Sequence, residues 1–163
     1  MAYLDTCIVS GLAKGDLGQP DVDALVKILR AHKQGLIRLV ASQVVHRELE
    51  AIPASYRASH EVIYSLLTDV PTVPTQRTDS GLTLCGVGGG SVEDPLFTAI
   101  KSILPDLPDA EHVFQASKAG ARYLITADRR SLSKHSASVE AACGLKVVTP
   151  TELEYAELVS DTP

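Results

Sequence analysis

The stretch Tyr3-Leu4-Asp5-Thr6 is a short apolar run that ends on a carboxylate. Later apolar runs, Leu36-Ile37-Arg38-Leu39-Val40, Tyr123-Leu124-Ile125-Thr126 and Leu145-Lys146-Val147-Val148, are separated from it and from one another by helical patterns. Short apolar runs that alternate with amphipathic helices are typical of βαβ units and a parallel sheet. The sequence therefore predicts an α/β fold with a central, mostly parallel sheet.

The helical patterns between these runs have recognisable ends. Apolar residues at 22, 25, 26 and 29 share one face of a helix expected from Pro20 to Gly35. Further helices are expected from Ser42, over 59–68, over 94–104 and from Asp109 to Gly120. Thr149-Pro150-Thr151-Glu152 is a capping box with proline at the first helical position, which predicts another helix start.

The length of 163 residues fits a single domain, 1–163. One segment, at about 71–95, breaks the alternation: it is rich in glycine and proline, and Gly86-Val87-Gly88-Gly89-Gly90 has neither helical nor strand periodicity. We predict a loop or insertion there, inside the domain, and not a linker between domains.

Composition excludes several classes of protein. Hydrophobic residues make up 45% and charged residues 21%, which excludes a disordered chain, a coiled coil and a collagen-like repeat. No run approaches the ~20 apolar residues that span a bilayer, and no signal peptide is recognisable, so we expect a cytoplasmic protein without a membrane partner. Cys7, Cys85 and Cys143 lie far apart and are expected to be reduced thiols, not zinc ligands.

The formal net charge is -5, from 15 basic and 20 acidic side chains. Proteins that bind nucleic acid nonspecifically are usually basic, so composition alone argues mildly against such a partner. A cluster of carboxylates that binds cations would itself make the total acidic.

Four acidic residues occupy positions that favour a functional site. Asp5 ends an apolar strand, Asp128 lies two residues past another, and ligands of open parallel sheets bind beyond the carboxyl ends of strands. Glu48 lies in the helix after the second strand, and Asp109 begins the helix that leads to the Tyr123 strand. Gathered carboxylates repel one another unless a cation compensates, and hard oxygen ligands suit Mg²⁺ or Mn²⁺.

Each of these residues also has an ordinary structural explanation. Asp5 and Asp128 are suited to capping turns, Asp109 to capping a helix, and Glu48 to an exposed helix face. His112, three residues after Asp109, is on its own more typical of packing or polar surface. The combination of the four carboxylates is what indicates a site.

Five motifs follow one another along the chain: Tyr3-Leu4-Asp5-Thr6; Ala41-Ser42 followed by Arg47-Glu48-Leu49; Leu107-Pro108-Asp109-Ala110-Glu111-His112 with Ala116 and Gly120; Leu124-Ile125-Thr126-Ala127-Asp128-Arg129; and Val148-Thr149-Pro150-Thr151-Glu152-Leu153. In this order the sequence resembles the PIN-domain family, metal-dependent nucleases that include toxins of type II toxin–antitoxin pairs. Only the region around 71–106 is unlike the usual compact member.

The resemblance implies a three-layer α/β/α domain with a metal-dependent endoribonuclease activity that hydrolyses RNA with Mg²⁺ or Mn²⁺. It implies that Asp5, Glu48, Asp109 and Asp128 are the catalytic set, of which Asp5, Asp109 and Asp128 bind the metal. Thr6, Ser42 and Thr126 match supporting positions, whereas Cys7 stands where many relatives carry asparagine. The implied partners are RNA, a small antitoxin protein and a second copy of the chain.

The role of Glu48 stays open between orienting or deprotonating the attacking water and completing the metal shell. Arg129, Arg130 and Lys134 follow Asp128 and are candidates for binding the RNA backbone, with an ordinary solvated helix start as the alternative.

Two further functions compete with the nuclease. One is a catalytically silent PIN-like module that binds RNA or protein. The other is a receiver-like signalling domain, which usually has a lysine at the end of a late strand; Lys146 lies inside its run, which disfavours this alternative.

Overall fold

Four short parallel strands form the central sheet of the computed structural model, which describes residues 1–76, 78–83 and 91–159. The strands are β1 (Ala2–Leu4), β2 (Leu39–Ala41), β5 (Tyr123–Ile125) and β6 (Lys146–Val148), in the order β2-β1-β5-β6. Tyr3 of β1 pairs with Val40 on one side and with Leu124 on the other. This sheet confirms the predicted α/β class with a parallel sheet.

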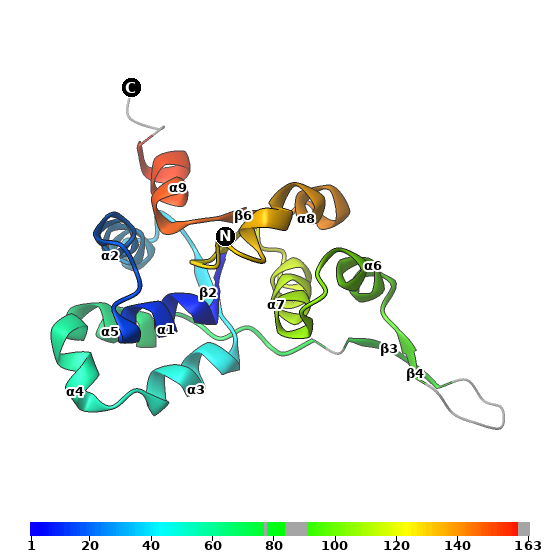
Figure 1. The fold of residues 1–163 in the computed structure, drawn as a ribbon, viewed down its shortest axis with the longest axis horizontal. Helices are drawn as coiled ribbons and strands as arrows, with labels where there is room; N and C mark the ends of the chain where they lie inside the picture. The colour runs from blue at the N-terminus through cyan, green and yellow to red at the C-terminus, as the bar shows by residue number, and fades with distance from the viewer. Residues whose placement is uncertain (77, 84–90, 160–163) are drawn as a thin grey trace.

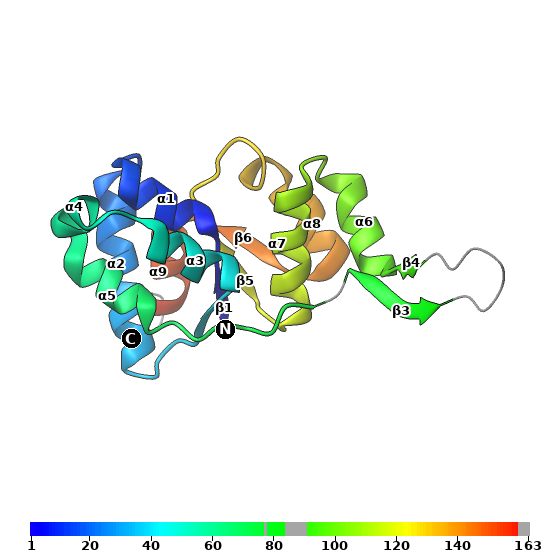
Figure 2. The same cartoon turned by 90° about the horizontal axis from the view of Figure 1, so that it is seen from below.

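Helices cover both faces of the sheet (Figures 1 and 2). One face carries α1 (Thr6–Lys14), α2 (Gln19–Lys33), α3 (Gln43–Ala51), α5 (Glu61–Thr68) and α9 (Pro150–Glu154). The other carries α6 (Pro95–Ile103), α7 (Leu107–Lys118) and α8 (Ser136–Cys143). Shorter helices are α4 (Ala54–Arg57), η1 (Ala58–His60), η2 (Ser133–His135) and η3 (Tyr155–Val159). In the described part of the chain no helix is long and apolar enough to cross a membrane.

The two faces follow from the alternation of side chains along each strand. Ala2 and Leu4 pack with the helices of the first face, while Tyr3 between them packs with α6, α7 and α8. Leu124 likewise faces α7, whereas its neighbour Ile125 faces the opposite helices. Each strand therefore contributes to two buried layers, an arrangement compatible with a three-layer α/β/α fold.

A two-stranded hairpin lies within the segment at about 71–95, for which we predict a loop or insertion. β3 (Asp79–Thr83) and β4 (Ser91–Glu93) pair antiparallel and project beyond α6 (Figures 1 and 2). The beginning of the segment also lies along the sheet, because the backbone N–H of Val73 donates to the carbonyl of Ala41 at 2.8 Å. Strand pairing joins two separated segments, so the periodicity within either one does not reveal it. The run Gly86–Gly90 lies outside the described residues.

Several element boundaries also differ from those predicted. β2 begins at Leu39 instead of Leu36, and α7 begins at Leu107 with Asp106 at its N-cap, so Asp109 is the third helical residue and not the first. The helix α1 directly after Asp5 was not predicted, because Cys7-Ile8-Val9 has the composition of a strand. The capping box at Thr149 and Glu152 is confirmed.

Candidate functional site

The carboxyl ends of the parallel strands bring polar residues to one edge of the sheet. Asp5 directly follows β1, Ser42 follows β2, and Thr126 follows β5. The helix α7 returns the chain to the amino end of β5, so its first turn, with Asp109, starts at the same edge. This edge is where open α/β sheets bind ligands.

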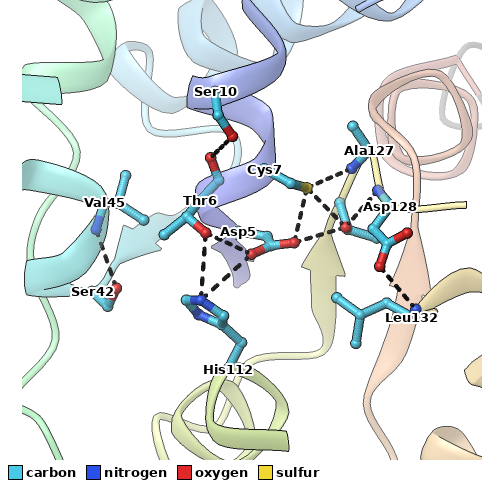
Figure 3. A network of polar contacts seen from close by, with 11 residues as sticks. Asp5, Thr6, Cys7, Ser10, Ser42, Val45, His112, Ala127, Asp128 and Leu132 are labelled. Atoms are coloured by element: carbon cyan, nitrogen blue, oxygen red, sulfur yellow. Dashed lines mark hydrogen bonds and ion pairs between the residues drawn. The ribbon is translucent and has the colours of Figure 1, made fainter. Parts of the chain in front are cut away.

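Asp5 is the centre of a buried polar network (Figure 3). Only 3% of its surface is exposed. Its Oδ2 accepts hydrogen bonds from the Cys7 thiol at 2.9 Å and from the Thr126 hydroxyl at 2.8 Å. Its Oδ1 accepts from the Thr6 hydroxyl at 3.4 Å and lies 3.7 Å from Nε2 of His112. Both carboxylate oxygens are therefore fixed in orientation by neighbouring side chains.

Cys7 acts in this network as a protonated thiol. Burial raises its pKa, and the nearby charge of Asp5 raises that pKa further. Its sulfur accepts a hydrogen bond from the backbone N–H of Ala127 at 3.0 Å while its thiol donates to Asp5. The residue at this position thus bridges the end of β1 to the segment after β5, and it does so without becoming a thiolate.

Asp128 is held by the turn that it begins. Its Oδ1 accepts from the backbone N–H groups of Arg130 at 2.8 Å and Ser131 at 3.2 Å, and its Oδ2 from that of Leu132 at 3.4 Å. Figure 3 shows its carboxylate directed to Leu132 and not to Asp5. Its own backbone N–H donates to the Thr126 hydroxyl at 3.0 Å. The structure therefore realises the ordinary explanation for Asp128, a turn-capping carboxylate, at the edge where a ligand would lie.

Asp109 has a raised pKa. Burial is the largest cause, and repulsion by Asp106, Asp128 and Asp5 adds to it, while a hydrogen bond with the Ser131 side chain opposes the rise. The carboxylates of Asp5, Asp109 and Asp128 therefore lie within electrostatic reach of one another. Three of the four predicted acidic residues are brought to one region.

The other predicted residues are placed less completely. Glu48 belongs to α3, but its side chain lies outside the description, as do those of residues 44, 59, 79–83, 91, 92 and 159. Ser42 is the N-cap of α3 and accepts from the backbone N–H of Val45 at 3.4 Å. Ser42 therefore fixes where the helix that carries Glu48 begins.

His112 also belongs to the site, although the sequence alone favours a packing or surface role for it. Its Nε2 lies 3.5 Å from the Thr6 hydroxyl as well as 3.7 Å from Asp5. The available signal was its spacing of three residues from Asp109, which places both on one face of α7. A single histidine has too little sequence context for that spacing to be decisive.

The negative charge of the site suits a cation, but the described side chains do not lie close enough together to enclose one. None of the Lys or Arg side chains within the described ranges forms an ion pair with Asp5, Asp109 or Asp128. Among described side chains, no three of His, Cys, Asp and Glu converge closely enough to enclose a metal ion. Mg²⁺ binds through one or two carboxylates and several waters, so the carboxylate charges fit such an ion without a complete protein cage.

A hollow of about 740 Å³ adjoins Asp128 and includes Asp16, Asp21, Arg129 and Arg130 in its lining. The two arginines are exposed, and Nη2 of Arg129 lies 3.5 Å from Asp21. Lys134 is exposed in η2. Positive side chains thus flank the carboxylate edge on the side of Asp128.

Comparison of the chain with protein-family models, with curated proteins and with solved structures gave no match. The resemblance to PIN domains accordingly stays a hypothesis based on the motifs.

Proposed function

We propose that this protein is a metal-dependent ribonuclease with a PIN-like fold. The observation that carries the proposal is the placement of Asp5, Asp109 and Asp128 at the carboxyl edge of the parallel sheet, near enough that repulsion among them adds to the effect of burial in raising the pKa of Asp109. Perturbed carboxylates in a cleft at the carboxyl edge of a parallel sheet are a frequent mark of a functional site. A bound cation would relieve this repulsion.

Asp5, Asp109 and Asp128 would hold Mg²⁺ or Mn²⁺, some of them directly and the others through water molecules. Such an ion supplies shielding of phosphate charge and lowers the pKa of bound water. The hydrogen bonds from Thr126 and Cys7 fix Oδ2 of Asp5, which favours preorganisation of this carboxylate as a ligand. Glu48 would orient or deprotonate the attacking water, or complete the metal shell.

Arg129, Arg130 and Lys134 would bind the RNA backbone beside the carboxylates. All three side chains are exposed, and Arg129 and Arg130 line the hollow at Asp128, which supports this role. Arg129 and Arg130 offset part of the acidic charge of that hollow, which Asp16, Asp21, Asp128 and Glu152 also line and which would otherwise repel a polyanion. A toxin role, a small antitoxin and a homodimer rest on the family resemblance alone.

A catalytically silent binding module is the second candidate. The capping bonds of the Asp128 carboxylate favour it, because they employ a proposed metal ligand in a structural task. A receiver-like domain has less support. Lys146 lies at the first position of β6 and pairs with Glu140 at 3.7 Å, away from the carboxyl end of that strand.

The test is incubation of labelled single-stranded RNA with the purified protein in Mg²⁺, in Mn²⁺ and in EDTA. We expect cleavage that requires the metal and is lost in Asp5→Asn. The matched control is Asp23→Asn, a change on the exposed face of α2 that should leave cleavage intact. Cleavage that persists in Asp5→Asn would overturn the site, and absence of both cleavage and metal binding by calorimetry would favour the silent module.

A further inference from the structure

A second, smaller pocket borders His112 and is called here the Tyr3 pocket. Its volume is about 170 Å³, and its polar lining residues are Tyr3, Ser42, Thr75, Glu111, His112 and Gln115. Tyr3 lies in β1, Ser42 follows β2, and Thr75 lies in the segment after α5. The other three residues belong to α7. Pockets for drug-sized molecules hold about 300–1,000 Å³, so this pocket has room for little more than a single planar ring system.

Tyr3 provides an unsatisfied polar group in the pocket lining. Its side chain is fully buried, and its hydroxyl has no hydrogen-bond partner among the described residues. A tyrosine hydroxyl can donate one hydrogen bond as well as accept. Ser42 lines the same pocket, but its hydroxyl and that of Tyr3 do not meet the geometry of a hydrogen bond. Buried hydroxyls are normally paired, so an acceptor on a ligand would satisfy this one.

The Tyr3 pocket and the carboxylate site share the imidazole of His112. The rings of Tyr3 and His112 meet edge to face, with centroids 6.3 Å apart. Nε2 of the same imidazole lies 3.7 Å from Oδ1 of Asp5. A group in the pocket would therefore lie one side chain away from the carboxylate at which we propose cleavage.

The wall of the pocket is preformed. Oε1 of Gln115 accepts from the backbone N–H of Gln76 at 2.7 Å, and Nε2 of Gln115 donates to the carbonyl of Gln76 at 2.8 Å. This reciprocal pair fixes the segment with Thr75 against α7. A rigid pocket loses little entropy when it binds a flat ligand.

Glu111 determines which ligand chemistry fits. Its carboxylate is exposed and takes part in no hydrogen bond or ion pair within the described residues. A carboxylate accepts and never donates when ionised, and it repels a phosphate group. The pocket thus favours a neutral ring with adjacent N–H donors for Glu111 and an acceptor for Tyr3. Guanine has these groups, since its N1–H and N2–H₂ are adjacent donors and its O6 is an acceptor.

We propose that the Tyr3 pocket binds a guanine base of single-stranded RNA, in a nucleotide next to the bond cut at Asp5. This inference rests on the proposed function for its polymeric substrate. It adds base specificity, which the carboxylates alone do not provide, since phosphate contacts carry no sequence information.

Binding is measured apart from cleavage. The protein in EDTA is titrated with guanosine, adenosine, cytidine and uridine 5′-monophosphates while the ring signals of His112 and Tyr3 are followed by NMR. We expect the guanosine nucleotide to bind about 5- to 150-fold more tightly than the others, the range for one bidentate base contact. Glu111→Gln should remove this preference. Glu140→Gln, a change at an exposed helix carboxylate outside the pocket, should retain it.

Cleavage of RNAs that differ at a single position then tests whether the bound guanine lies next to the bond that is cut. Cuts should fall beside guanine, and Glu111→Gln should relax that preference. Tyr3→Phe should weaken guanosine nucleotide binding; if this core variant does not fold, Glu111→Gln decides.

The outcomes separate this inference from the nuclease itself. Equal binding of all four nucleotides, or an unchanged preference in Glu111→Gln, overturns the guanine assignment even if metal-dependent cleavage occurs. Selective binding that Glu111→Gln abolishes supports the pocket even if no RNA is cut, and in that case the proposed function fails alone.

Discussion

The hydroxyl of Thr126 donates a 2.8 Å hydrogen bond to Oδ2 of Asp5, across 121 positions of sequence. The same hydroxyl accepts from the backbone N–H of Asp128 at 3.0 Å. One side chain thus couples the end of β1 to the turn after β5. Asp5 and Asp128 are two proposed metal ligands. Thr126, the residue directly after β5, therefore fixes their positions relative to each other.

The first prediction concerns the free energy of unfolding of Asp5 and Thr126 variants. Asp5→Asn replaces one acceptor oxygen by an amide donor, which leaves one neighbouring donor unpaired and should cost about 1–3 kcal/mol. Thr126→Val removes a bond to a buried charge and should cost a similar amount. Because both changes break the same contact, the double variant should lose clearly less than the sum in urea unfolding. Additivity within about 0.5 kcal/mol would show that the two residues act independently.

The second prediction separates the capping role of Asp128 from its proposed metal role. Asn retains a carbonyl oxygen for the backbone N–H groups of Arg130 and Ser131 and loses only the longer bond from Leu132, so Asp128→Asn should reduce thermal stability less than Asp128→Ala. Asp128→Ala should lose about 0.5–2 kcal/mol, the range for a lost capping oxygen. Both variants should lose metal-dependent cleavage, because neither has the charge. Full cleavage by Asp128→Asn would exclude a metal-binding role and leave Asp128 only its role in capping the turn.

The third prediction uses the raised pKa of Asp109. A carboxyl whose pKa is higher in the folded than in the unfolded protein contributes stability at low pH, and that contribution is lost as the pH rises through the folded pKa. In EDTA at pH 7, Asp109→Asn should therefore be more stable than the wild type. The difference should fade as the pH falls below about 3.9, the unfolded value. Urea unfolding at several pH values measures it.

A control for this prediction is Asp23→Asn on exposed α2, which should change stability little at any pH. If Asp109→Asn is less stable than the wild type at pH 7, neither burial nor the repulsion from Asp106, Asp128 and Asp5 governs this carboxyl.

The fourth prediction concerns RNA binding by Arg129 and Arg130. Changing both to Glu should weaken binding to single-stranded RNA, and the slope of log affinity against log salt should fall by about 1.4 if each arginine neutralises one phosphate. Fluorescence anisotropy across salt concentrations measures this slope. The matched control is Arg30→Glu with Arg38→Glu, which makes the same charge change at exposed residues outside this hollow. Equal loss in both pairs would mean that net charge, and not this surface, controls binding.

Some of the site was predictable because its signals are local. The alternation of Ala2, Tyr3 and Leu4 fixes a strand with two buried faces, and a carboxylate at its end points to the ligand-binding edge. The cap of Asp128 on Arg130 is also local, since an aspartate commonly bonds the backbone two residues on. The role of Glu48 stays a prediction, because its side chain lies outside the described residues.

By itself, the sequence determined the α/β class, most of the helices and the carboxylates at the strand ends, because periodicity and capping depend on neighbours within a few residues. Only the tertiary structure decided which distant groups meet: His112 beside Asp5, Cys7 as a protonated donor, and the unpaired Tyr3 hydroxyl in a pocket. These contacts arise when parallel strands and α7 pack together, and no sequence period encodes the distance between residues a hundred positions apart.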